Sequence, residues 1–152
     1  MPAKLRMAVD LSLERRDAIA LQLAQTRQHW TNAQLQLDQL ESYADETTRR
    51  WTGQLTSCTP ELMRHHYQFM ERLTHAITLQ RSVVADQYNA MARVAAVLRE
   101  AEARLQSLRE LVAIRQREQQ HQQDRREQKS TDEFASQQYR RRALAGTAGT
   151  AR

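Results

Sequence analysis

The regular spacing of apolar residues in the second half of the chain most strongly limits what it can fold into. Between residues 63 and 112, steps of alternately three and four residues reach an apolar side chain at nearly every position. The positions are Met63, His66, Met70, Leu73, Ile77, Gln80, Val84, Gln87, Met91, Val94, Leu98, Ala101, Leu105, Leu108 and Val112. Such spacing is the seam of a coiled coil, whose supercoil keeps the seam against a partner helix. One helix cannot bury this seam alone.

A weaker seam in the first third of the chain supplies that partner. It consists of Ile19, Leu23, Thr26, Trp30, Ala33, Leu37, Leu40, Ala44, Thr47 and Trp51. In the short connection that follows, we expect Gly53 to end the first helix in the left-handed conformation and Thr59 to cap the second, before Pro60. A short connection makes the helices antiparallel neighbours, so residue i should face roughly residue 112 − i.

The sequence therefore predicts an all-α fold, a long antiparallel two-helix coiled coil (an α-helical hairpin) whose second helix projects beyond the first. Only three Gly and two Pro are present, and the long segments between them favour continuous helix. We expect one coiled-coil domain over residues 1–152, with helix one at about 5–52, the hairpin loop at about 53–59, helix two at about 60–142 and a flexible tail at 143–152.

The apolar pattern stops after Ile114. Residues 115–133 contain no apolar side chain, but also no Gly or Pro, and their charges are mixed in sign. Such a segment is typical of a solvated helix that projects past the start of helix one. The alternative is a disordered tail, since polar Gln-rich segments often fail to fold.

The charge of the chain favours acidic partners without identifying one. Its net charge is +5, but 18 acidic residues are interspersed among 23 basic ones. A basic coiled coil that binds nucleic acid or anionic lipid would need one basic face, and the alternation of sign argues against it. Cys58 is the only cysteine, so no internal disulfide forms and a reducing compartment is expected. We find no signal peptide or long apolar run, and expect a soluble protein.

No pattern of catalytic or cofactor-binding residues is present. The sequence lacks a phosphate-binding glycine loop, a nucleophile elbow and any Cys/His ligand spacing. His65 and His66 are adjacent, so on a helix they diverge by about 100° and do not share a metal ion. We therefore expect neither enzyme activity nor a metal, a cofactor or a small-molecule substrate.

Apolar side chains just outside the two seams mark a candidate protein-binding surface. Tyr43, Phe69 and Ala76 each lie one step off a seam, and the expected register sets Tyr43 opposite Phe69. One interpretation is that they widen the core locally. The other is an exposed apolar patch across both helices, which usually marks a protein-binding site.

At these residues the chain resembles the FliJ family of flagellar type III export proteins. The resemblance lies in residues 36–43 (QLDQLESY), 67–77 (YQFMERLTHAI) and 127–135 (EQKSTDEFA), followed by Arg140 and Arg141. It implies a two-helix coiled coil similar to part of the rotor γ subunit of rotary ATPases. It also implies a cytoplasmic protein, peripherally associated with the inner-membrane export apparatus.

The resemblance further implies three partners: the export ATPase hexamer, the cytoplasmic domain of the export gate protein, and export chaperones. It implies that the protein promotes assembly of the ATPase ring and that its helical ends enter the pore of the ring. The family's gate-contacting patch carries over to Gln36, Leu40, Tyr43, Phe69, Leu73 and Ala76. Candidate ATPase contacts are Arg115, Arg117, Arg125, Arg126, Lys129 and Phe134. The equivalent stalk protein of a virulence-type secretion system is the nearest alternative.

Overall fold

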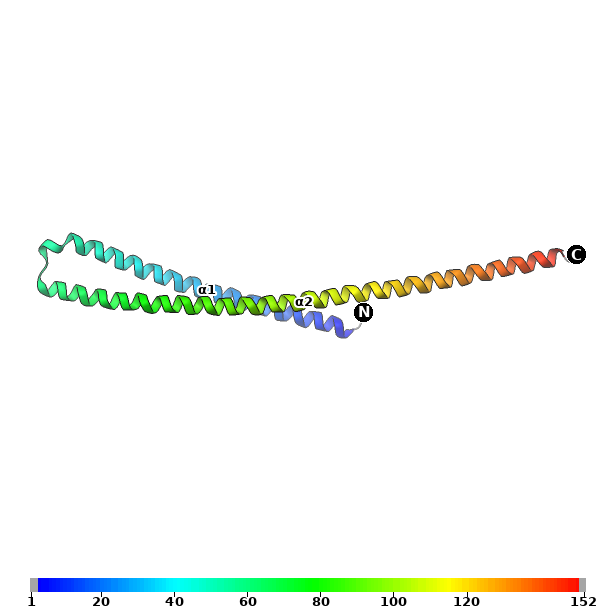
Figure 1. Ribbon diagram of the computed structural model, residues 1–152, viewed down its shortest axis with the longest axis horizontal. Helices are drawn as coiled ribbons and strands as arrows, with labels where there is room; N and C mark the ends of the chain where they lie inside the picture. The colour runs from blue at the N-terminus through cyan, green and yellow to red at the C-terminus, as the bar shows by residue number, and fades with distance from the viewer. Residues whose placement is uncertain (1–2, 151–152) are drawn as a thin grey trace. The chain divides into compact units, whose positions relative to one another are not determined.

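Two long helices make up nearly the whole of the computed structural model, which describes residues 3–150, and the side chains of all of these except Leu55 and 148–150. Helix α1 (Ala3–Gly53) leads through a short 3-10 helix η1 (Leu55–Ser57) to helix α2 (Pro60–Thr150). The helices run antiparallel and pack against each other as a hairpin (Figure 1). The described residues contain no strand. The expected all-α hairpin coiled coil is confirmed.

The chain forms two compact units. The hairpin unit comprises Leu11–Leu105 and holds most of both seams, together with the connection between the helices. The other unit comprises Met1–Asp10 and Gln106–Arg152. Within it Leu5 is buried, and Leu108 and Val112 are half-buried. None of the helices in residues 3–150 carries an apolar stretch long enough to cross a membrane.

Burial follows the spacing expected from the sequence. Every seam position of α1, from Ile19 to Trp51, is buried or half-buried, and so is every seam position of α2 except Met63. Met63 lies one turn before His66, where the seam ends in a ring stack described below. The apolar stripe is thus the contact surface between the helices, as amphipathic helices require.

The centre of the hairpin core is a cluster of three buried side chains, Leu37, Leu73 and Ile77. The partly buried residues Leu40, Ala44, Met70 and Val84 pack around it. Burying a Leu or Ile side chain fully stabilises a fold by about 1.5–3 kcal/mol relative to leaving it in water. A two-helix core is narrow, so a few such residues supply much of its stability.

The connection is partly as expected. The Thr59 hydroxyl accepts a hydrogen bond from the Leu62 backbone N–H (3.3 Å), so Thr59 caps α2 as predicted. The predicted left-handed conformation of Gly53 is wrong, because no glycine of the described residues has a positive φ. Instead, the last turn of α1 is of the 3-10 type, in which the Gln54 N–H donates to the Trp51 carbonyl three residues earlier (3.0 Å). This bond satisfies one of the terminal carbonyls of the helix without a left-handed residue.

Helix α2 does not end with its seam. Every side chain of residues 115–147 is exposed, yet these residues remain helical. The helix continues to Thr150, past the end expected at residue 142, while residues 151–152 of the expected flexible tail lie outside the described residues. Residues 115–142 are rich in Arg, Glu and Gln, which are good helix formers, and contain neither Gly nor Pro, so propensity favours helix there.

Candidate functional site

The two aromatic rings of the expected patch lie against each other across the hairpin. The centroids of Tyr43 on α1 and Phe69 on α2 are 6.0 Å apart, with the rings at 83°. This edge-to-face arrangement is the favoured geometry for an aromatic pair. The predicted pairing of these residues is confirmed. Tyr43 remains 51% exposed and Phe69 39%, so the pair is presented to solvent rather than enclosed.

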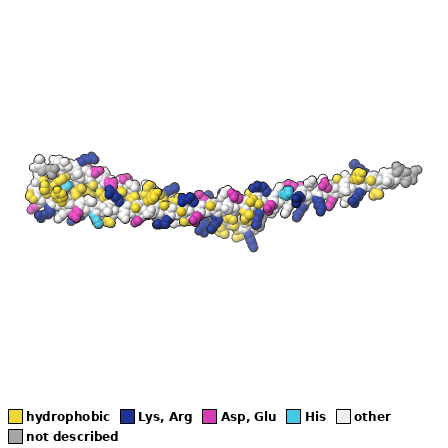
Figure 2. All heavy atoms as spheres, viewed as in Figure 1, with side chains coloured by type: hydrophobic (Ala, Val, Ile, Leu, Met, Phe, Trp, Pro, Cys, Tyr) yellow, Lys and Arg dark blue, Asp and Glu magenta, His cyan; other side chains and the backbone are white. Residues whose placement is uncertain are grey.

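The other residues of the patch form its floor and rim. Leu73 is buried in the core cluster, and Leu40 packs half-buried against that cluster. Ala76 is half-buried, and Gln36 is exposed at the edge. The core-widening interpretation therefore applies only to the half-buried Ala76, whereas Tyr43 and Phe69 form an exposed apolar surface above the buried seam residue Leu73. Figure 2 shows hydrophobic side chains reaching the surface towards the looped end of the hairpin.

A groove of about 410 Å³ lies beside this pair. It is lined by Gln36, Gln39, Leu40, Tyr43 and Gln80. The Gln80 side-chain amide donates to the Ala33 carbonyl (2.9 Å) and to the Gln36 side-chain oxygen (3.2 Å), which joins α2 to α1 at this point. A polar residue at one seam position favours a single helix register. The interruption of the seam at Gln80 was the signal for this contact, although the sequence did not reveal its partners.

An ion pair joins the helices on the other side of the seam. The Arg81 guanidinium lies 3.1 Å from the Glu41 carboxylate, and both side chains are largely exposed. Exposed pairs of this kind contribute about 0–1 kcal/mol. The pair therefore adds little stability, and it places two charged side chains beside the seam at this point.

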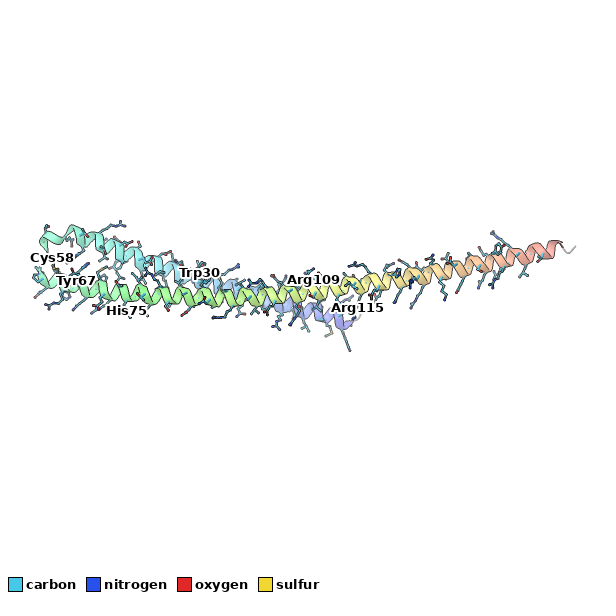
Figure 3. The ribbon with its side chains drawn as sticks, in the orientation of Figure 1. Trp30, Cys58, Tyr67, His75, Arg109 and Arg115 are labelled. Atoms are coloured by element: carbon cyan, nitrogen blue, oxygen red, sulfur yellow. The ribbon has the colours of Figure 1, made fainter. Side chains whose placement is uncertain are left out.

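The looped end of the hairpin is closed by stacked rings. Trp51 and His66 lie parallel, with centroids 4.0 Å apart and an interplanar angle of 4°. Tyr67 meets His66 edge-on at 6.1 Å, and Cys58 is a half-buried free thiol in the connection (Figure 3). His66 is a polar residue at a seam position, and its ring fills the seam opposite the bulky Trp51. In the described part of the chain, no group of His, Cys, Asp and Glu could hold a metal ion.

The candidate ATPase contacts lie apart from this patch in the sequence and in character. All are exposed residues of α2: Arg115, Arg117, Arg125, Arg126, Lys129 and Phe134. Arg125 and Lys129 are four residues apart and so lie on the same side of the helix. Carboxylates such as Asp124 and Glu127 alternate with them. This surface is charged in both signs and nearly free of apolar side chains.

Comparison with known proteins gives one family. A family model described as "Flagellar FliJ protein" matches residues 1–144. The match includes the patch around Tyr43 and Phe69, and all of the charged candidate residues in α2. No curated protein and no solved structure matches the chain.

Proposed function

The chain belongs to the flagellar FliJ protein family, a component of flagellar type III export, and on that premise we propose that it links the export ATPase to the export gate. It binds the ATPase hexamer as a central stalk similar to a rotary γ subunit, and it promotes assembly of the ring. It also contacts the cytoplasmic domain of the gate protein and export chaperones, and it works at the inner membrane as a peripheral cytoplasmic protein.

The patch on the hairpin is the surface for the gate domain. The observation that carries this is the exposed Tyr43–Phe69 pair, which rests on Leu73 and Leu40 of the core. Aromatic side chains held rigidly above a packed floor bury large apolar area on binding and lose little conformational freedom. Gln36 and Gln39 border the pair and supply hydrogen-bonding groups at the rim of such an interface.

The exposed part of α2 is the surface for the ATPase ring. Residues 115–147 offer charges of both signs and few apolar groups. A helix of this kind binds in a pore through screened, shallow electrostatic contacts, so that no single rotational position is strongly preferred. The basic residues from Arg115 to Lys129 and the exposed Phe134 are its proposed contacts.

The rate of ATP hydrolysis and the ring assembly of the cognate export ATPase test this function. We would compare the full chain, the chain truncated after Leu111, and the variant Tyr43→Ala, Phe69→Ala. Stimulation should require the exposed part of α2 and survive the double substitution. The same double variant should lose binding to the gate domain, while the matched pair Leu21→Ala, Leu35→Ala, which is exposed elsewhere, should keep it. Stimulation that persists after truncation, or an absence of any ATPase binding, would refute the stalk role.

A further inference from the structure

Two lines of residues flank the seam of α2, and their contacts with α1 distinguish them. One line contains Phe69, which meets Tyr43. We call it the Phe69 flank. The other contains Arg81, which pairs with Glu41. We call it the Arg81 flank. Residues seven apart lie on the same side of a supercoiled helix, so each line can be followed along α2 in steps of seven.

The Phe69 flank is apolar at every such step between residues 62 and 97. Its members are Leu62, Phe69, Ala76, Val83, Ala90 and Val97. Leu62 is 54% exposed, and Val83 and Val97 are 42% exposed, so α1 leaves these three residues open to solvent, while Ala76 and Ala90 are half-buried. The Arg81 flank over the same length carries Tyr67, Thr74, Arg81, Tyr88, Ala95 and Glu102.

This asymmetry is unusual for a helix with one partner. In a two-stranded coiled coil the positions beside the seam are usually charged, as Arg81 and Glu41 are here. A helix with a third apolar line beside its two seam lines has the wider stripe of a helix packed in a bundle. The hairpin thus lacks one neighbour on the side of Phe69.

The surface on this side is hollowed where a neighbour would pack. The groove of about 410 Å³ beside Tyr43 lies on the same side of the seam, and it is lined by α1 residues including Gln36 and Tyr43 and by Gln80 of the α2 seam. A smaller hollow of about 40 Å³ lies at the other end of the same flank, lined by Ser12, Arg15, Val97, Glu100, Ala101 and Arg104. Both hollows lie within the hairpin unit, and Val97 of the apolar line borders the smaller one.

The charges beside this line indicate the chemistry of the neighbour. On α1 the facing positions are Arg15, Gln22, His29, Gln36, Tyr43 and Arg50, none of them acidic. On α2, the residues one helical turn beyond the line include two basic ones, Arg72 and Arg93, and two acidic ones, Asp86 and Glu100. Seven residues after Val97, the line itself continues to Arg104. Arg50 pairs with Glu46, but Arg15, Arg72 and Arg93 form no ion pair with any described residue. The balance on this side is basic.

We propose that one acidic amphipathic helix of a protein partner lies along the Phe69 flank and converts the hairpin into a three-helix bundle. The line between residues 62 and 97 is about 50 Å long, which matches a helix of about 35 residues. The apolar face of that helix covers Val83, Ala90 and Val97, and its carboxylates meet the unpaired arginines. A second copy of this chain would bring the same arginines against each other, so it is not the occupant.

This inference rests on the proposed function, because Phe69 and Ala76 of the gate patch belong to the same line. It extends that patch by three further heptads, from Ala76 to Val97, and it specifies the partner's element as a helix with acidic edges. Helix-in-groove recognition of this type uses anchors repeated at helical spacing.

The test uses two synthetic helical peptides of about 35 residues with the same Leu/Ala seam, one edged with Glu and one with Lys. The full chain is titrated with each at moderate salt, and binding is followed by calorimetry. The Glu-edged peptide should bind at least about ten-fold more tightly than the Lys-edged one. Equal binding of the two peptides, or no binding of the Glu-edged one, would overturn the proposal.

Substitutions then locate the binding surface. Val83→Glu, Val97→Glu should weaken binding of the Glu-edged peptide by at least about ten-fold. The control Leu21→Glu, Leu35→Glu makes the same change in charge at exposed residues of α1 (62% and 56%) that lie off both flanks. This control should bind the peptide as the unaltered chain does. If the Glu pair unfolds the hairpin, Val83→Thr, Val97→Thr removes apolar surface at nearly constant shape and should weaken binding in the same direction. Equal loss in the control, or no loss in either valine variant, would place the peptide elsewhere.

Sedimentation and gate binding separate the remaining outcomes. If the chain alone formed a dimer that Val83→Glu, Val97→Glu dispersed, a second copy would be the occupant and the inference would fail. The gate domain is titrated against the same variants. If it bound normally to the valine variants but not to Tyr43→Ala, Phe69→Ala, the inference would fail while the proposed function stood. If it did not bind the unaltered chain, the gate-binding role would fail, whatever the peptide result.

Discussion

The hairpin of residues 11–105 and the exposed part of α2, residues 115–147, are equally helical, but different interactions hold them so. In the hairpin, buried side chains such as Leu37 and Ile77 pack across two helices. In the exposed part, side chains make local contacts: for example, the Gln120 side-chain amide donates to Asp124 (3.0 Å) and the Thr131 hydroxyl donates to the Glu127 carbonyl (2.8 Å). Tertiary burial therefore stabilises one region, and helix propensity with short-range contacts stabilises the other.

This difference suits two kinds of partner. A packed hairpin holds Tyr43 and Phe69 in fixed positions, which favours a specific interface. A helix without tertiary contacts opens easily and presents charge on all sides, which suits a shallow and adaptable contact. The division also predicts that substitutions will affect the two regions by different mechanisms.

The largest effect is expected from truncating the hairpin core. Leu73→Ala removes a side chain that is only 7% exposed and leaves a cavity beside Leu37 and Ile77, so the free energy of unfolding should fall by about 3 kcal/mol. Leu79→Ala makes the same change at a 56% exposed site on the same helix and should lower it by about 0.5 kcal/mol or less. Thermal and urea unfolding followed by circular dichroism measure both. Similar losses in the two variants would mean that the seam is not the source of stability.

A smaller effect is expected at the polar seam positions. Gln80→Ala removes the hydrogen bonds to the Ala33 carbonyl and to Gln36, and should lower the free energy of unfolding by about 1 kcal/mol. Gln87 is also a half-buried seam glutamine, but it makes no hydrogen bond across the described hairpin. Gln87→Ala is the matched control and should be nearly neutral in the same unfolding experiment. Equal changes would assign the effect of Gln80 to packing rather than hydrogen bonding.

One substitution placed in both regions separates them directly. Ser82 and Ser130 are exposed residues of α2, one in the hairpin and one in the exposed part. Ser82→Gly should lower the free energy of unfolding of the hairpin by about 0.5 kcal/mol, because glycine disfavours helix. Ser130→Gly should leave the hairpin transition unchanged and reduce only the helical signal at low temperature. A shift of the main transition by Ser130→Gly would show that the two regions unfold together.

The smallest effect is expected at the Arg81–Glu41 pair. Arg81→Ala should change the free energy of unfolding by no more than about 0.5 kcal/mol, since both side chains are largely exposed. Unfolding at low and high salt checks this, because the small loss should vanish when salt screens the pair. If Arg81→Ala lowered the free energy of unfolding more than Gln80→Ala does, the ion pair would contribute more to stability than the Gln80 hydrogen bonds, contrary to this account.

Much of the hairpin could be predicted because its pattern is periodic. The apolar 3–4 spacing gave the seams, and the short connection placed Tyr43 opposite Phe69. The register was less accurate elsewhere: Trp30 meets the ring of Tyr88, whereas the simple rule points to Ser82. A large aromatic side chain can reach beyond its own position, and the rule based on backbone position therefore missed the contact of Trp30.

The remaining details depend on side-chain conformations and local backbone geometry that periodicity does not encode. The bonds of Gln80 to Ala33 and Gln36, and the stack of His66 on Trp51, need particular rotamers. Gly53 is a frequent residue after helices, but here a tight turn satisfies the end of α1 with no left-handed residue. The patch itself was predicted from residues just off the seam, whereas its groove with Gln39 and Gln80 emerged only from the packed helices.

Hydrogen exchange of the full chain, measured with each partner added separately, tests the two-surface account most directly. The cognate gate domain should slow exchange of backbone amides around residues 36–43 and 69–76, and leave residues 115–134 unchanged. The ATPase should do the reverse, with strong protection in the exposed part of α2, where free amides exchange fastest. If both partners protected the same region, the proposal of two separate surfaces would be wrong.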